Sequence, residues 1–214
     1  MNRNTFGKKA VLVALFAAFT AAGSFIQIPL PGGIPIAVQD MMSMLCGLLL
    51  GPVYGALAVL VFLALGCMGL PVFTGKAGIN VILYGPTGGF LVGYFLAAVA
   101  GCLIVRLFVR DGASALNSIE EAELADEAEA QAQKKSRVLA EAWNWAFITL
   151  AAVVATVIAF VCGVIGFHRV KPDFAMSKVI AAVVLPFIPG NLLKIVLMVP
   201  LTKKLRPAIR NFAG

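Results

Sequence analysis

Long apolar segments, separated by short polar or glycine- and proline-rich stretches, dominate this sequence. Five of them approach or exceed the roughly 20 apolar residues that a helix needs to cross the hydrocarbon core of a membrane. They cover residues 9–27, 40–70, 79–105, 143–167 and 176–205. Because backbone polar groups must be satisfied within lipid, each segment is predicted to form membrane-spanning α-helix.

The charges at the two ends of the chain add one crossing to this count. Basic residues precede the first segment and follow the last one. The positive-inside rule places both ends in the cytoplasm, which requires an even number of crossings. Gly51-Pro52 interrupts the second segment, and proline suits the first turn of a new helix. We therefore predict separate helices over Gln39–Leu50 and Pro52–Gly69, and six transmembrane helices in total.

The amino-acid composition is typical of a membrane protein and argues against a soluble domain. Of the 214 residues, 61% are hydrophobic and only 13% are charged, with a mean hydropathy of +0.97. A soluble domain carries about 25% charged residues. The predicted fold class is thus all-α: residues 1–214 form a single polytopic membrane domain in the plasma membrane, with no separate soluble catalytic domain.

The net charge of +7 is unevenly distributed. Residues 111–142 hold most of the acidic side chains and have no apolar stripe, so we predict a charged cytoplasmic loop, part of it solvated helix, between the fourth and fifth helices. The basic residues lie mostly at the ends of apolar segments, where they set orientation and meet anionic lipid. This distribution favours membrane lipid as a partner and argues against nucleic-acid binding.

Two of the remaining connections, which face outward in this topology, are unusual. Residues 28–36 read IPLPGGIPI, an uncharged apolar loop stiffened by prolines. Residues 71–86 read PVFTGKAGINVILYGP, which is too long for a turn and too short to span, and therefore suggests a re-entrant segment. Non-helical backbone at membrane depth is tolerated where it lines a cavity. We therefore predict an outward-facing pocket.

Few polar side chains lie near the predicted pocket. They are Gln39, Asp40, Thr74, Lys76, Asn80, Tyr84, Thr87, Asn191 and Lys194. Asn191 follows a Pro-Gly break, and Lys194, three residues later, shares its helical face. A lysine inside the membrane is costly unless it is paired or faces water, so it indicates a functional site. The alternative is that Lys194 snorkels to the interface and Asn191 only caps the last helix.

The sequence offers little for catalysis or metal binding. Each of the four cysteines stands alone within an apolar segment, and the single histidine, His168, has no partner at metal-ligand spacing. There is no G-x-S-x-G or H-E-x-x-H motif, and no Walker A phosphate-binding loop. We therefore expect neither an enzyme nor a metalloprotein, and no cofactor in this chain. Any ATP-driven motor must be a separate subunit.

Small residues form a stripe along the first helix. Ala10, Ala14, Ala18 and Ala22 recur every four residues. Such small-x-x-x-small spacing lets another helix approach closely within a membrane. The partner helix could belong to this chain or to another protein, and the spacing alone favours neither.

Several long motifs resemble one known family. These are IPLPGGIPIAVQ, LLLGPVYGALAVLVFLALGCMGLPVF, GPTGGFLVGYFLAA and LPFIPGNLLK, in that order, and they cover nearly the whole chain outside residues 106–145. Their order and spacing resemble the BioY family, the biotin-binding S components of energy-coupling factor (ECF) transporters. One departure is that members commonly read Pro-Gly-Asp-x-x-Lys where this chain has Asn191 in place of the aspartate.

The resemblance implies a substrate-binding subunit of a biotin uptake transporter. Biotin would bind from outside through Asn191, Lys194, Gln39, Asn80, Tyr84 and Thr87. Transport would be energised by two ATPase subunits that use ATP, through a transmembrane coupling subunit. By the same resemblance, Ala14 and Ala18 would dock on that coupling subunit. The alternatives are an S component for another vitamin and a stand-alone biotin facilitator, because a fold alone does not fix the ligand.

Overall fold

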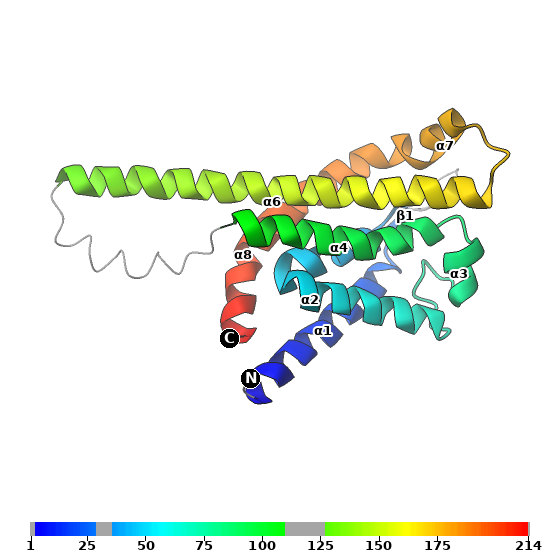
Figure 1. Cartoon of the computed structure of the whole chain (residues 1–214), viewed down its shortest axis with the longest axis horizontal. Coiled ribbons are helices and arrows are strands. Elements are labelled where there is room, and N and C mark those ends of the chain that lie inside the picture. Colours follow the sequence, from blue (N-terminus) through cyan, green and yellow to red (C-terminus); the bar gives the residue numbers. More distant parts are fainter. Residues whose placement is uncertain (1–2, 29–35, 110–126, 214) are drawn as a thin grey trace.

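The protein is described by a computed structural model that covers residues 3–28, 36–109 and 127–213. These residues are mostly helical, and the elements are shown in Figure 1. The helices are α1 (Arg3–Gly23), α2 (Gln39–Cys67), α3 (Ile79–Tyr84), α4 (Gly88–Phe108), α6 (Glu127–Val170), α7 (Met176–Val183), the 3₁₀-helix η1 (Leu185–Phe187) and α8 (Ile188–Ala213). Two-residue strands β1 (Gln27–Ile28) and β2 (Ile36–Ala37) pair antiparallel.

Within the described ranges, five stretches of helix are long and apolar enough to cross a membrane. The second of them, α2, is broken at Gly51, whose φ of 92° and ψ of 172° interrupt the helix immediately before Pro52. A positive φ is readily adopted by glycine, and proline removes the backbone donor that would continue the hydrogen-bond ladder. The break divides α2 into the two predicted arms. The all-α fold with six membrane helices is therefore confirmed.

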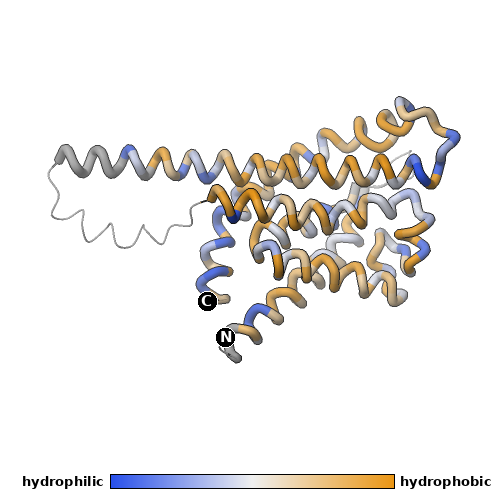
Figure 2. Tube along the Cα trace, in the orientation of Figure 1, coloured by the Kyte–Doolittle hydropathy of each residue, from blue (hydrophilic) through white to orange (hydrophobic). Residues whose placement is uncertain are grey.

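The helices pack side by side around α4. This helix lies against α2 on one side and α6 on the other, while α1 packs on α2, and α8 contacts both α2 and α6. The main core joins α2, α4, α6 and α8 through buried side chains such as Leu48, Ala97, Ile148 and Met198. Figure 2 shows hydrophobic residues along the length of the bundle and hydrophilic ones concentrated toward its ends. Many large apolar side chains remain exposed, as expected of a surface that faces lipid.

The described ends of the chain lie at the same end of the bundle (Figure 1). The Phe108 end of α4 and the N-terminal part of α6 point the same way, whereas α3 and the turn between α6 and α7 lie at the opposite end. This arrangement agrees with an even number of crossings.

Part of the predicted charged loop is helical. Helix α6 begins at Glu127 and continues without interruption to Val170, so residues 127–142 extend the membrane helix. Residues 111–126 of that loop lie outside the described residues. The Trp143 indole donates a hydrogen bond to the Phe108 carbonyl at 3.0 Å, and Phe108 stacks on Phe147 at 4.7 Å between ring centroids. These contacts join α6 to the end of α4 where the polar extension meets the apolar bundle.

The segment over residues 71–86, which the sequence predicts to be re-entrant, consists of a tight turn followed by a short helix. Phe73 and Lys76 exchange two backbone hydrogen bonds in a tight turn, and the six-residue α3 follows with no buried residue. Phe73 of the turn is buried against Gly66, where a Cβ would collide with its ring, and Val81 and Ile82 of α3 pack against the same core cluster.

Candidate functional site

A pocket of about 590 Å³ lies among the helix ends opposite the chain termini. The N-terminal ends of α2 and α4, the C-terminal half of α6, the start of α8, β2 and the turn before α3 all contribute to its lining.

Aromatic rings form much of the pocket wall. Phe90 lies edge to face with Phe160 at 5.8 Å between centroids, and Phe160 lies edge to face with Phe187 at 6.1 Å. Phe73 and Tyr94 line the pocket as well. Gly163 makes room for Phe90, because a Cβ there would collide with its ring. Together the rings offer a shaped apolar surface to a flat or fused-ring ligand.

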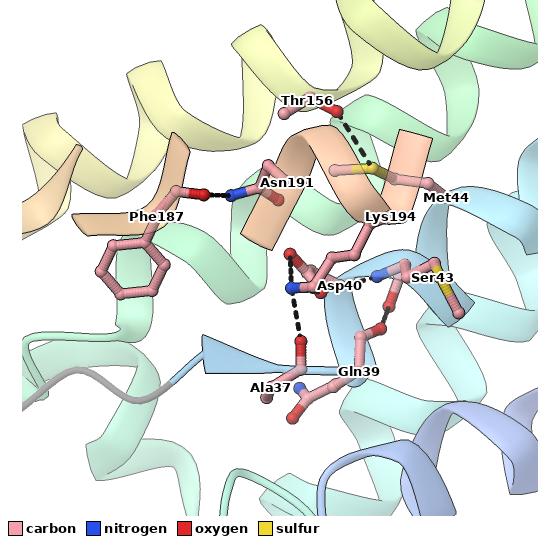
Figure 3. A network of polar contacts seen from close by, with 10 residues as sticks. Ala37, Gln39, Asp40, Ser43, Met44, Thr156, Phe187, Asn191 and Lys194 are labelled. Atoms are coloured by element: carbon pink, nitrogen blue, oxygen red, sulfur yellow. Dashed lines mark hydrogen bonds and ion pairs between the residues drawn. The ribbon is translucent and has the colours of Figure 1, made fainter. Parts of the chain in front are cut away.

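A buried ion pair provides the polar part of the same pocket. The Lys194 ammonium donates to both carboxylate oxygens of Asp40, at 2.7 and 2.8 Å, and to the Ala37 carbonyl at 2.6 Å. Figure 3 shows Lys194 on α8 reaching across to Asp40 and Ala37. Lys194 is only 8% exposed. This geometry excludes the alternative that the lysine snorkels to the interface.

Pairing of the strands β1 and β2 positions the two groups that accept hydrogen bonds from Lys194. Gln27 pairs with Ala37, and the Val38 amide donates to the Ile26 carbonyl, which together fix the chain just before α2 begins at Gln39. The Ala37 carbonyl and the Asp40 carboxylate consequently lie on the same side of the chain where α2 begins. They compensate the charge of a lysine that would be costly to bury alone.

Two amide side chains, Gln39 and Asn191, also line the pocket. Gln39 is 1% exposed, and within the described structure its Oε1 atom has no hydrogen-bond partner, although its residue lines the pocket. The Asn191 Nδ2 atom donates to the Phe187 carbonyl at 2.9 Å, one turn back along the chain (Figure 3). Asn191 therefore does not act as the predicted N-cap, because its amide donates to a carbonyl in η1 instead of accepting from an α8 amide.

The structure brings together most of the residues predicted from the sequence. Gln39, Thr87, Asn191 and Lys194 line one pocket, and Thr74 joins them. Three of the predicted polar residues are placed elsewhere. Asn80 and Tyr84 lie exposed on α3, Tyr84 with 73% exposure, and Lys76 is exposed in the preceding turn.

Sequence reasoning missed the aromatic wall and the partner of Lys194. Asp40 was recognised as a polar residue near the pocket, but nothing in the local pattern joined it to a residue 154 positions away. The phenylalanines resemble ordinary lipid-facing or core residues in sequence. Tyr94 offered the clearest signal, as a polar aromatic residue in the middle of an apolar segment.

The alanine stripe of α1 faces away from the fold. Ala10, Ala14, Ala18 and Ala22 are all exposed, whereas Ala17, which borders the stripe on the side toward the bundle, is 1% exposed. The stripe is therefore not covered by the part of the chain that the structure describes. Among the described residues, no group of three or more His, Cys, Asp or Glu side chains is arranged to hold a metal ion.

Comparison with known proteins gives a consistent result. The sequence profile of the BioY family matches residues 1–211. The biotin transporter BioY of Rhodobacter capsulatus is 35% identical over 198 residues, which cover 88% of each chain. A probable biotin transporter BioY of Lysinibacillus sphaericus is 47% identical over 98 residues, covering 45% of this chain and 49% of that protein. The crystal structure of the S-component for biotin from an ECF-type ABC transporter matches with a TM-score of 0.72 at 25% identity, covering 97% of this chain and 95% of that one. This multi-pass membrane protein therefore belongs to the BioY family.

Proposed function

We propose that this chain is the biotin-binding S component of an ECF-type uptake transporter. The observation that carries the proposal is the buried Asp40–Lys194 pair inside an aromatic pocket. The relatives from Rhodobacter capsulatus and Lysinibacillus sphaericus, named as biotin transporters, support the choice of ligand. As a transporter component rather than an enzyme, the chain would bind and release its ligand unchanged.

The chemistry of biotin fits the residues of the pocket. Its apolar fused ring matches the wall formed by Phe90, Phe160 and Phe187. Its ureido group needs both donors and acceptors: the Asp40 carboxylate would accept from a ureido N–H, and the Lys194 ammonium would donate to the ureido oxygen in place of one of its present acceptors. The Oε1 atom of Gln39, which has no partner among the residues that the structure describes, adds a second acceptor for a ureido N–H group. An unpaired buried acceptor is costly, so a ligand that satisfies it gains affinity.

Mass spectrometry of the small molecule retained by the protein tests the choice of ligand. We expect protein purified in detergent from biotin-fed cells to carry biotin in near-stoichiometric amount, and excess unlabelled biotin to displace a labelled sample. Retention of a different vitamin would identify an S component for that vitamin instead. Recovery of no vitamin, together with no heat of binding on titration with biotin, would contradict the proposal.

The proposed direction of transport needs a defined orientation. We infer that both termini and residues 111–142 are cytoplasmic, so that the pocket opens outward. Twelve of the seventeen basic residues then lie on the cytoplasmic side, as the positive-inside rule requires. The turn between α6 and α7 carries Lys171 and faces outward against this bias, where it could help to collect an anionic ligand.

Cysteine accessibility in intact cells tests this orientation. In a background with all four native cysteines replaced, Asp173→Cys, in the exposed turn after α6, should react with a membrane-impermeant maleimide. Lys135→Cys, on the extension of α6, should react only after the cells are permeabilised. Labelling of Lys135→Cys in intact cells would reverse the topology and contradict an outward-facing pocket.

We further propose that the partners of this chain are a transmembrane coupling subunit and two ATPase subunits that hydrolyse ATP. The exposed stripe of Ala14 and Ala18 on α1 supports a docking role, because it leaves a smooth face on which a second helix can approach closely. No ATP-binding motif is present in this sequence, so the energy for transport would come from those subunits.

A further inference from the structure

The two charged side chains of the pocket neutralise each other. Among the pocket-lining residues that the structure describes, Lys194 is the one cation and Asp40 the one anion. Residues 29–35, which lie outside the described ranges, contain no ionisable side chain. An ammonium group has three N–H donors, and Lys194 directs its own to the two Asp40 carboxylate oxygens and the Ala37 carbonyl (Figure 3). The pocket wall is therefore neutral, and its lysine already has three acceptors.

The ion pair favours an uncharged ligand group beside it. Burying an ionised carboxylate is unfavourable unless a counter-charge compensates it. If Lys194 turned to a carboxylate of the ligand, Asp40 would lose its own counter-charge, and one buried carboxylate would still be uncompensated. A ureido oxygen can instead replace the Ala37 carbonyl as an acceptor while the ion pair remains intact. The uncharged ring system of biotin therefore fits beside Asp40 and Lys194 better than its carboxylate does.

The pocket wall reaches solvent at the turn before α3. Phe73 and Lys76 close this turn through two backbone hydrogen bonds, with Thr74 and Gly75 between them. Thr74 lines the pocket, whereas Gly75 and Lys76 are exposed. A ligand tail that passes Thr74 consequently enters water, where hydration stabilises a carboxylate and an exposed ion pair with Lys76 would contribute little.

We propose, on the basis of the biotin-binding function proposed above, that the pocket recognises the ureido ring system and leaves the carboxylate of the tail in water beside Thr74. The ligand class is then wider than biotin itself. It includes derivatives of biotin whose carboxylate is converted to a neutral amide. A neutral pocket wall and a hydrated tail together make the affinity nearly independent of the charge on the tail.

Isothermal titration of the full chain in detergent with biotin and with biotinamide, its primary amide, tests this proposal. We expect the two dissociation constants to agree within about fivefold, which is the most that an exposed ion pair contributes. A carboxylate paired with a buried cation would make biotinamide weaker by about 30-fold or more, and this result would overturn the proposal. Binding of neither compound would overturn the proposed function as well, whereas binding of biotin alone would overturn only the wider ligand class.

Lys194→Ala separates the ring from the tail in the same titration. The variant should weaken biotin and biotinamide by the same factor, because the lysine acts on the ring system that the two compounds share. A loss confined to biotin would assign the carboxylate to Lys194 and contradict the proposed orientation of the ligand.

A charge placed at Thr74 tests the position of the tail. Thr74 has a φ of 50°, which aspartate and asparagine adopt more readily than most residues, so Thr74→Asp and Thr74→Asn form a matched pair. Thr74→Asp should bind biotin about fivefold more weakly than Thr74→Asn, because like charges a few ångströms apart in water repel each other. Biotinamide should bind both variants equally. Equal binding of biotin by the two variants, or an equal loss of biotin and biotinamide in Thr74→Asp, would place the carboxylate elsewhere and overturn the proposal.

Discussion

Replacing Lys194 with alanine is expected to weaken biotin binding by about 2–5 kcal/mol, which is about 30- to 5,000-fold in the dissociation constant. Lys194 is buried, and its ammonium donates to Asp40 and to the Ala37 carbonyl. Its removal would take a donor from the pocket and leave the Asp40 carboxylate buried without its counter-charge. A buried charge that loses its partner is strongly destabilised, so the variant loses more than one hydrogen bond.

Isothermal titration with biotin in detergent measures this effect. Lys178→Ala is the matched control, since Lys178 is exposed on α7 at the same end of the bundle and does not line the pocket. The control should bind biotin as the parent does. Asp40→Asn and the double variant with Lys194→Ala complete a double-mutant cycle, in which the two losses should be far from additive because the two residues act as a unit. An unchanged affinity in Lys194→Ala would remove the lysine from the site.

Hydropathy alone predicted most of the fold. The requirement for about 20 apolar residues per crossing located the spanning helices, and Gly51-Pro52 located the break within α2 because both residues act locally on the backbone. The start of α6 at Glu127 was harder to place. Alanine, glutamate and glutamine favour helix, yet they resemble a solvated loop when only apolar periodicity is examined.

Neighbouring site residues could be predicted when they are close in sequence. Contacts between site residues that are far apart in sequence could not. Asn191 and Lys194 share a face because helical spacing requires it. The pairing of Lys194 with Asp40 depends on how α8 packs beside α2, which no local pattern encodes. Asn80 and Tyr84 were predicted to lie near the pocket because the glycine-interrupted segment was expected to enter the bundle, whereas the structure places both on the exposed side of α3.

Tryptophan at Ala14 or Ala18 is expected to abolish both co-purification with the coupling subunit and ATP-dependent biotin uptake, while leaving biotin binding nearly intact. Both alanines are exposed on α1, so the larger side chain would project outward without disturbing the core. Close helix packing in membranes depends on small residues at the contact, and an indole there would hold the partner helix away. Pull-down of the assembled transporter, uptake of labelled biotin and titration in detergent measure the three quantities separately.

Two further tryptophan variants serve as controls for this experiment. Val157→Trp enlarges a residue of α6 that is 54% exposed and lies away from the stripe, so it should leave assembly, uptake and binding unchanged. Ala17→Trp enlarges the buried side of α1 and should reduce biotin binding together with assembly, because an indole cannot fit where Ala17 is 1% exposed. If Ala14→Trp behaved like Ala17→Trp, the stripe would contribute to the fold. If Ala14→Trp and Ala18→Trp both behaved like Val157→Trp, the coupling subunit would dock on another face of this chain.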